Sequence, residues 1–169
     1  MTASWPDFDP GELLSALTGR GVDFVVVGGI GAVLLGSPRL TRDLDITFAP
    51  DPLNLESLGE ALVELGAQLK GVEDDVPFVA DAATLRRVQV LTLTTRAGEI
   101  DLLAEPEGGP GYQKLRKRAE RINVGDVTVL VASIEDLISM KQAAGRPKDL
   151  ADLEELETIR RLRRRPGPC

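Results

Sequence analysis

The sequence contains no histidine, and this absence excludes whole classes of catalytic site. Ser-His-Asp and Cys-His nucleophilic machinery and histidine-ligated zinc sites all depend on that residue. Any chemistry must therefore rest on carboxylates, lysine, arginine and hydroxyl groups. Such groups suit magnesium, which prefers oxygen ligands.

Cysteine is almost as scarce, since the single one, Cys169, is the last residue. The chain therefore has neither a disulfide framework nor a thiolate cage for a metal. No apolar run approaches the ~20 residues that a helix needs to span a bilayer. The N-terminal stretch lacks the basic region and apolar core of a signal peptide. We expect a cytoplasmic protein with no membrane partner.

An overall excess of positive charge is also missing, because the formal net charge is -7. Residues 160–169 hold five arginines and no acid, which leaves -12 on the rest of the chain. A protein that binds nucleic acid by charge alone is usually basic overall. Contact with nucleic acid would therefore need local patches, such as Lys114–Arg121 and Arg160–Arg165. The alternative is that the arginine run is the solvated C-terminal end of a helix. Its positive charges would then interact favourably with the negative end of the helix dipole.

The length of 169 residues suits one domain with a small helical appendage. Apolar spacing and turn residues predict strands near 23–27, 43–48, 87–94, 99–103, 122 and 127–131. They predict helices near 10–19, 30–35, 52–65, 114–118, 133–144 and 149–164. This order indicates an α+β fold, a small mixed β-sheet packed on helices with a C-terminal helical element. The lack of a long β-α-β alternation argues against a doubly wound dinucleotide fold.

The stretch Val25–Phe48 is the most informative part of the chain. It predicts a strand, a glycine turn at Gly28 and Gly29, a short helix, a polar loop and a second strand. On that second strand Asp43 and Asp45 share one face, because alternate residues of a strand point the same way. Two adjacent carboxylates repel each other unless a cation lies between them, and a divalent metal is the obvious candidate. The glycines leave room for a phosphate to approach the backbone.

Each motif alone has an ordinary structural explanation. An isolated D-x-D is most often a half-exposed strand with a solvated face, and Gly-Gly is a tight turn. Together with Asp101 on another short strand, they predict a three-carboxylate site. Such a site can hold two magnesium ions, one on a triphosphate and one that lowers the pKa of an attacking hydroxyl.

The pattern hydrophobic-Gly-Gly, thirteen intervening residues, Asp43-h-Asp45-h and a later Asp101 resembles the nucleotidyltransferase superfamily of the DNA polymerase β type. Three further segments, Arg39–Asp45, Asp136–Lys141 and Gly145–Asp152, are similar to the AbiEii/MenT-type nucleotidyltransferases. Those proteins are the toxins of bacterial toxin–antitoxin pairs. The narrower resemblance implies transfer of nucleotides from an NTP, often a pyrimidine one, to the 3′ end of tRNA. Aminoacylation and translation would then be blocked.

The resemblance also implies roles for single residues. Asp43 and Asp45 would bind metal, and Asp101 would be the third carboxylate, as a ligand or as a base. Lys141 would act on the triphosphate and Asp149 or Asp152 would orient it. The nucleotide-binding set would be completed by Gly28, Gly29, Arg39, Arg42 and Arg146. The structural alternatives are a solvated helix residue for Lys141 and an ordinary capping acid for Asp149.

Partners and regulation are implied in the same way. A cognate antitoxin is expected, and antitoxins of this group can act as kinases. They phosphorylate a Ser or Thr two residues before the first aspartate, which is Thr41 here. We expect a nucleotidyltransferase core over residues 1–131, a helical element over 132–165 that completes the site, and a tail over 166–169.

Two other functions stay open. An enzyme of the same fold could nucleotidylate a small molecule, such as an antibiotic, or a protein side chain, and a small-molecule acceptor would need a closed pocket rather than a basic approach surface. A nucleotidyltransferase-like antitoxin could instead neutralise a toxin by binding it. The intact set of Asp43, Asp45 and Asp101 argues against a purely degenerate scaffold.

Overall fold

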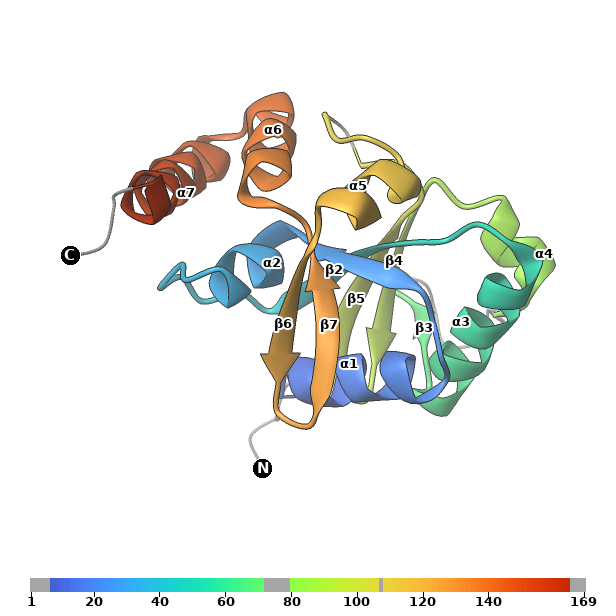
Figure 1. The fold of residues 1–169 in the computed structure, drawn as a ribbon. Helices are drawn as coiled ribbons and strands as arrows, with labels where there is room; N and C mark the ends of the chain where they lie inside the picture. The colour runs from blue at the N-terminus through green and yellow to red at the C-terminus, as the bar shows by residue number, and fades with distance from the viewer. Residues whose placement is uncertain (1–6, 72–79, 107, 165–169) are drawn as a thin grey trace.

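A computed structural model describes residues 7–71, 80–106 and 108–164 (Figure 1). In these residues the chain forms a seven-stranded mixed sheet in the order β3-β4-β5-β2-β1-β7-β6. Helices α6 and α7 lie at one side of the sheet, and α3 and α4 lie at the other. The predicted α+β class is confirmed. The predicted tail, 166–169, falls outside the described residues.

The N-terminal third follows the predicted order. Helix α1 covers Pro10–Gly19, and its cap Asp9 accepts a hydrogen bond from the Glu12 amide at 3.0 Å. Strand β1, helix α2 and strand β2 then cover Phe24–Val27, Gly28–Leu34 and Asp43–Phe48. The glycine pair was expected to form a turn ahead of the helix, but the structure places both glycines in the first turn of α2. Gly28 lets the helix begin directly after β1 because its φ is +65°, a value that residues other than glycine rarely adopt.

The middle of the chain holds two elements that the predicted order of strands and helices does not include, a short strand and a short helix. Helix α3, Pro52–Glu64, begins where it was expected, with Asp51 as its N-cap, and is followed by the edge strand β3, Gln68–Leu69. The strand expected from Arg87 begins only at Val90, because helix α4, Ala82–Arg86, precedes it. Asp81 caps α4 by accepting a hydrogen bond from the Thr84 amide at 2.7 Å. This Asp-x-x-Thr capping signal is short and was missed.

The remaining elements occur where they were expected. Strands β4 and β5, Val90–Thr95 and Gly98–Leu103, form a hairpin. They are followed by helix α5 (Tyr112–Arg118) and by strands β6 (Glu120–Val124) and β7 (Val127–Val131). Helices α6 (Ile134–Ala144) and α7 (Pro147–Arg164) end the described chain. Ser133 caps α6, and the left-handed Gly145 ends it. The expected boundary between residues 131 and 132 falls between β7 and α6.

The register of the sheet positions the acids. Strand β2 pairs antiparallel with β1 and parallel with β5, which sets Asp45 directly opposite Asp101. Leu44 and Ile46 point to the other face of β2 and are fully buried, as are Ile100 and Leu102 on β5. Each buried leucine or isoleucine stabilises the fold by about 1.5–3 kcal/mol relative to exposure. The same alternation that builds the core therefore presents the carboxylates on the opposite face.

None of the helices within the described ranges combines the length and the apolar character that crossing a bilayer requires.

Candidate active site

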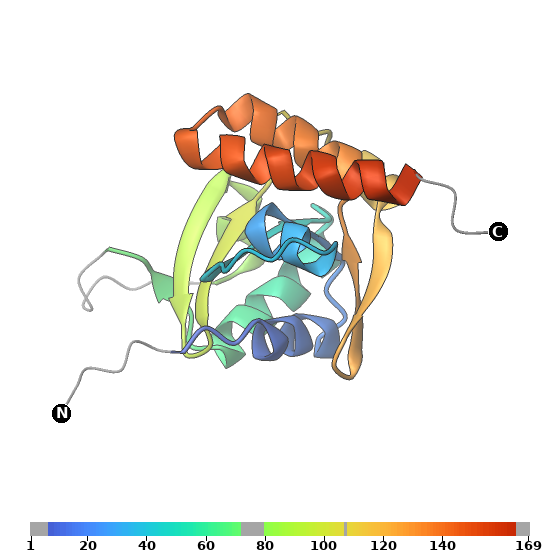
Figure 2. The ribbon, with the colours of Figure 1, turned by 90° about the vertical axis from the view of Figure 1, so that its left-hand side faces the viewer.

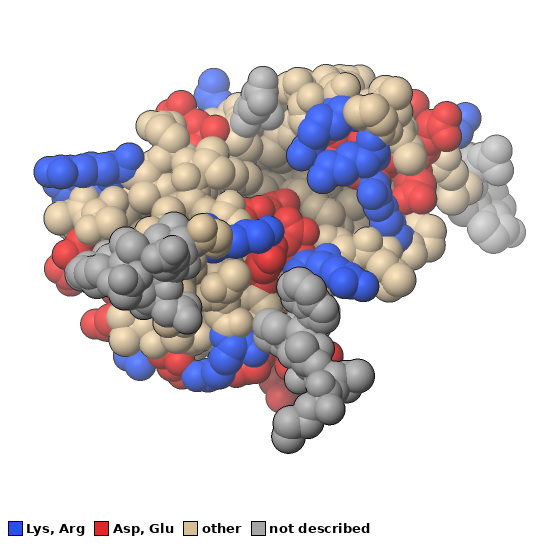
Figure 3. Space-filling view, turned by 180° about the vertical axis from the view of Figure 1, so that it is seen from behind, with Lys and Arg blue, Asp and Glu red and all other residues tan. Residues whose placement is uncertain are grey.

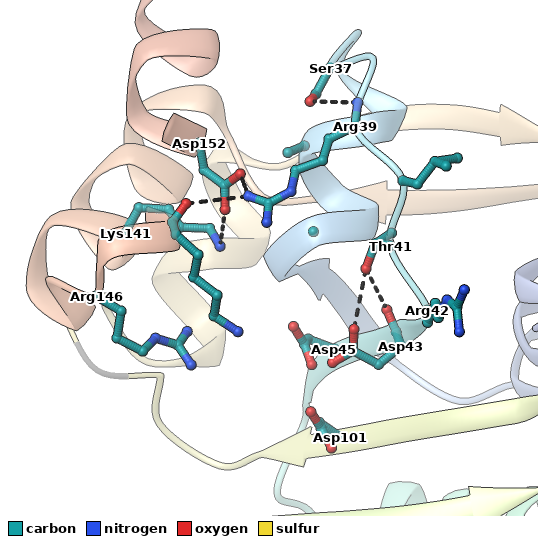
Figure 4. Close-up of a pocket in the computed structure, with 14 residues that line it drawn as sticks. Ser37, Arg39, Thr41, Arg42, Asp43, Asp45, Asp101, Lys141, Arg146 and Asp152 are labelled. Carbon is teal, nitrogen blue, oxygen red and sulfur yellow. Dashed lines mark hydrogen bonds and ion pairs between the residues drawn. The ribbon is translucent and has the colours of Figure 1, made fainter. Parts of the chain in front are cut away.

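Three carboxylates from two neighbouring strands form the centre of the site. Each of Asp43, Asp45 and Asp101 places one carboxylate oxygen within 4.8 Å of the others. Figure 4 shows them beside a space that α6 and α7 close from the other side. The Oδ1 atom of Asp101 is buried and has no hydrogen-bond partner among the described residues. A divalent cation would satisfy that oxygen and offset the repulsion, so these residues could hold one.

The raised pKa of Asp45 shows that three charged carboxylates without a cation between them are unfavourable. Burial raises the pKa of Asp45 to about 8, and contact with Asp101 and the charges of Asp43 and Asp101 add to this effect. The positive charge of Lys141 lowers this pKa, but by less than the other effects raise it. At neutral pH the cation-free cluster therefore keeps a proton that a bound cation would displace.

Lys141 of α6 faces two acids of α7. Its Nζ lies 3.2 Å from Asp149 Oδ1 and 2.9 Å from Asp152 Oδ2. The lysine side chain is 16% exposed and that of Asp149 is fully buried. Lys141 is therefore held in one place by two carboxylates, unlike a solvated helix residue.

Asp149 combines the capping role with this ion pair. Its Oδ2 accepts hydrogen bonds from the Arg146 backbone amide at 3.1 Å and from Arg146 Nε at 2.8 Å. An acid at the third helical position that accepts a hydrogen bond from the N-cap backbone amide is half of a capping box. Burial opposes the charge, but the hydrogen bonds from Arg146 and Lys141 lower the pKa of Asp149 to about 2. The carboxylate is thus charged across the physiological range.

The loop between α2 and β2 is tied to α7. Arg39 forms an ion pair with Asp152 and donates a hydrogen bond to the Lys148 carbonyl at 3.3 Å. The Ser37 hydroxyl donates to Glu155 Oε2 at 2.8 Å. These contacts, visible in part in Figure 4, bring a loop of the core against the C-terminal helix across the site.

The two glycines lie against the acids and their neighbour. A Cβ at Gly28 would collide with the Asp45 carboxylate, and one at Gly29 would lie 2.8 Å from Thr41 Oγ1. The Thr41 hydroxyl in turn donates to Asp43 Oδ1 at 3.2 Å. Glycine at these positions lets Asp45 of β2 and Thr41 of the preceding loop pack closely on the start of α2.

A cavity of about 410 Å³ joins most of the predicted residues. Its lining includes Gly29, Arg39, Thr41, Arg42, Asp43, Asp45, Asp101, Lys141, Arg146 and Asp152. The other two predicted residues, Gly28 and Asp149, line a neighbouring cavity of about 460 Å³. Figure 3 shows a hollow with acidic side chains on its floor and Lys or Arg side chains around it. Sequence reasoning missed Ser37 and Lys148, which also line the first cavity. Ser37 lies outside the motifs, and Lys148 lies within the segment Gly145–Asp152 but was given no role.

The chain was compared with protein families, with curated proteins and with solved structures. The family described as "Nucleotidyl transferase AbiEii toxin, Type IV TA system" matches residues 12–165. Comparison with curated proteins gives no match. The crystal structure of the lincosamide antibiotic adenylyltransferase LnuA, lincomycin-bound, is 21% identical with a TM-score of 0.61, and the match covers 90% of this chain and 99% of that one.

The antibiotic-resistance factor ANT(2″)-Ia is a second structural relative. Its solution structure is 16% identical with a TM-score of 0.55, and the match covers 92% of this chain and 89% of that one. Its crystal structure in complex with adenylyl-2″-tobramycin is 16% identical with a TM-score of 0.54, covering 91% of this chain and 92% of that one. At these identities the likeness shows a shared fold.

Proposed function

The chain belongs to the nucleotidyl transferase AbiEii toxin family of type IV toxin–antitoxin systems, and we propose that it transfers nucleotides to the 3′ end of tRNA with magnesium as cofactor. The donor is an NTP, and the resemblance favours a pyrimidine one. The observation that carries the proposal is the cluster of Asp43, Asp45 and Asp101 on the wall of a cavity that is also lined by lysine and arginine.

The reaction joins an acceptor oxygen to the α-phosphorus of the NTP. The bond from that phosphorus to the bridging oxygen breaks, and pyrophosphate and a proton leave. Asp43, Asp45 and Asp101 would hold magnesium, which neutralises phosphate charge and lowers the pKa of the attacking hydroxyl. Asp101 would act either as a ligand of this magnesium or as the base that accepts the hydroxyl proton, through its buried Oδ1, which has no hydrogen-bond partner among the described residues. Lys141 and Arg39 stabilise the charge that develops on the leaving pyrophosphate.

The C-terminal helical element, 132–165, completes this site in our proposal. It supplies Lys141, and the acids of α7 hold that lysine at the cavity. Arg39 reaches one of these acids, Asp152, from the core, so a triphosphate would share both cations with Asp152. Arg42 and Arg146 line the cavity as further phosphate contacts. Asp149 and Asp152 act through Lys141 and are positioning residues.

Exposed basic side chains support an RNA acceptor. Lys114, Arg116 and Lys117 are exposed on α5, and Arg161 and Arg164 are exposed at the end of α7. The Arg163–Glu120 ion pair, at 2.5 Å, joins the end of α7 to β6, which directly follows α5. Arg164 lies about 18 Å along the helix axis from Asp152. A single-stranded 3′ end could enter the site while phosphates farther along the RNA meet these cations.

Two alternatives remain as outcomes of the test. LnuA and ANT(2″)-Ia are described as an antibiotic adenylyltransferase and an antibiotic-resistance factor, so the same fold serves small acceptors. A protein side chain is a further possible acceptor class. An antitoxin that acts only by binding would not need the three carboxylates to converge as they do.

An end-labelling assay tests the proposal. The purified protein is incubated with magnesium, total tRNA and each labelled NTP in turn, beside an Asp43→Ala variant. Label on the tRNA 3′ end that disappears in the variant is the expected result, and it names the nucleotide. If folded, NTP-binding protein labels no tRNA with any of the four nucleotides, the tRNA acceptor is excluded. The same reactions with small molecules and proteins then identify the acceptor.

We extend the proposal to regulation by a cognate antitoxin that acts as a kinase on Thr41. The Thr41 hydroxyl already donates to the Asp43 carboxylate. A phosphate at this position would add up to two negative charges beside the acids and remove the donor, which would repel an NTP. Mass spectrometry after coexpression with the antitoxin tests this, and an unmodified Thr41 in inhibited protein would contradict it.

A further inference from the structure

A second cavity, of about 460 Å³, lies beside the carboxylates and is not explained by the chemistry of phosphate transfer. Its volume is in the ~300–1,000 Å³ range typical of small-molecule sites. It shares Asp45, Lys141 and Arg146 with the first cavity. A ligand could therefore extend from one cavity to the other past the reaction centre.

The walls of this second cavity are mostly apolar. Val90 and Leu103, which are paired in register on β4 and β5, form one wall. Leu137, Met140 and Ala144 form another, and their i, i+3, i+7 spacing puts them on one face of α6. The space between a sheet and a helix suits a flat ring, and the thioether of Met140 packs favourably against an aromatic face.

The chemical difference between the cavities suggests how they divide a ligand. The first is lined by the cations Arg39, Arg42 and Lys148, which suit phosphates, and none of these three lines the second. Among the residues that the structure describes, and outside the shared residues and the buried Asp149, Glu105 is the only charged side chain that lines the second cavity. A carboxylate can accept hydrogen bonds from ring or amino N–H groups but repels phosphate.

We propose that the second cavity binds a nucleobase, held between Val90 and Leu103 on one side and Met140 and Ala144 on the other. This inference rests on the proposed nucleotidyl transfer. Two sources supply the same chemistry, the base of the NTP and the terminal base of the acceptor. Either base would be attached to a group that reacts beside Asp45.

Filling the cavity tests the inference. Val90 is 65% exposed, so Val90→Trp can place a ring into the cavity without disturbing the core. The matched control is Val63→Trp, because Val63 is 69% exposed and lies on α3 at the other side of the sheet. Ala144→Leu fills the cavity from α6 and provides a second variant. Calorimetry measures the Kd of each NTP and of inorganic tripolyphosphate, which has no base, and kinetics give the KM for tRNA.

The outcomes separate the two sources. If the cavity binds the base of the NTP, Val90→Trp and Ala144→Leu weaken NTP binding at least tenfold and leave tripolyphosphate binding unchanged. If it binds the acceptor's base, NTP binding is unchanged and the KM for tRNA rises at least tenfold. Effects no larger than those of Val63→Trp would overturn the inference, as would an equal loss of tripolyphosphate binding. The calorimetry does not depend on transfer, so it tests binding of the NTP's base even if tRNA is not the acceptor.

Discussion

Asp45 is the residue whose surroundings are least favourable to its own charge. Because its pKa rises from 3.8 to about 8 on folding, the folded protein keeps a proton that the unfolded chain releases. The stability that this proton gives is complete below pH 4 and is lost as the pH rises to about 8. We therefore expect the melting temperature of chelator-treated protein to fall over this range.

Thermal unfolding in a chelator between pH 4 and 9 measures the effect. Asp45→Asn, which cannot ionise, should flatten the profile, whereas Asp126→Asn in the exposed β6–β7 turn should leave it unchanged. Magnesium should restore stability at pH 8 in the wild type and in Asp126→Asn, but not in Asp45→Asn. An identical decline in both variants would show that Asp45 is not the group responsible.

Gly28 gives a test of close packing at the site. An alanine there has a strained positive φ and a Cβ that collides with the Asp45 carboxylate. Gly66 has a φ of +67° and no atom within 4 Å of a Cβ, so Gly66→Ala carries the backbone strain alone. Each change should cost about 1–2 kcal/mol of unfolding free energy from that strain. Denaturant unfolding and transfer assays should show that only Gly28→Ala also loses activity, by at least tenfold. Equal activity in the two variants would contradict the close approach.

Helix α7 is the element that carries both positioning acids, and its docking depends on few apolar contacts. Leu156 is fully buried, whereas Leu162 on the same helix is 59% exposed. Leu156→Ala should cost about 2–5 kcal/mol, the usual range for a buried leucine. It should also raise the KM for NTP, because Asp149 and Asp152 would hold Lys141 less firmly. Leu162→Ala should change neither quantity by a measurable amount. A destabilised Leu156→Ala protein with an unchanged KM would separate α7 docking from the site.

Elements with local signals were predictable from the sequence, and contacts between distant residues were not. The caps Asp9, Asp51 and Ser133 mark helix starts within a few residues, and the structure has all three. The pairing of Asp45 with Asp101 depends on β5 lying next to β2, which no local pattern specifies. Asp101 was predictable as a third acid on a short strand, but its position opposite Asp45 was not.

The same limit applies to the site. The ion pair between Arg39 and Asp152 joins a loop to a helix far along the chain, and only the fold shows it. Val90 and Met140 belong to apolar patterns that favour core packing, so nothing in those patterns indicates a second cavity. Cavities are a property of shape, which composition and periodicity do not contain.

At the scale of the whole molecule, charge is distributed unevenly, and RNA binding should reveal this. Arg161→Glu with Arg164→Glu at the end of α7 should weaken tRNA binding and lower the slope of log K against log salt by about 2, one for each lost phosphate contact. The control is Arg86→Glu with Arg87→Glu, exposed near α4 at the other side of the molecule. Fluorescence titrations at several salt concentrations measure both. Equal slopes in the two double variants would contradict an RNA path along α7.

The strand register that aligns Asp45 with Asp101 also aligns Leu44 with Ile100. A slip of β5 by one residue would turn every side chain to the other face of the sheet, with Asp101 in the core and Ile100 outside it. Burying an unpaired carboxylate and exposing isoleucine both oppose that state. A misregistered molecule would therefore be unstable as well as inactive. Specific activity is then proportional to the fraction of correctly folded molecules. After refolding, the fraction that regains activity should equal the fraction that regains a compact state.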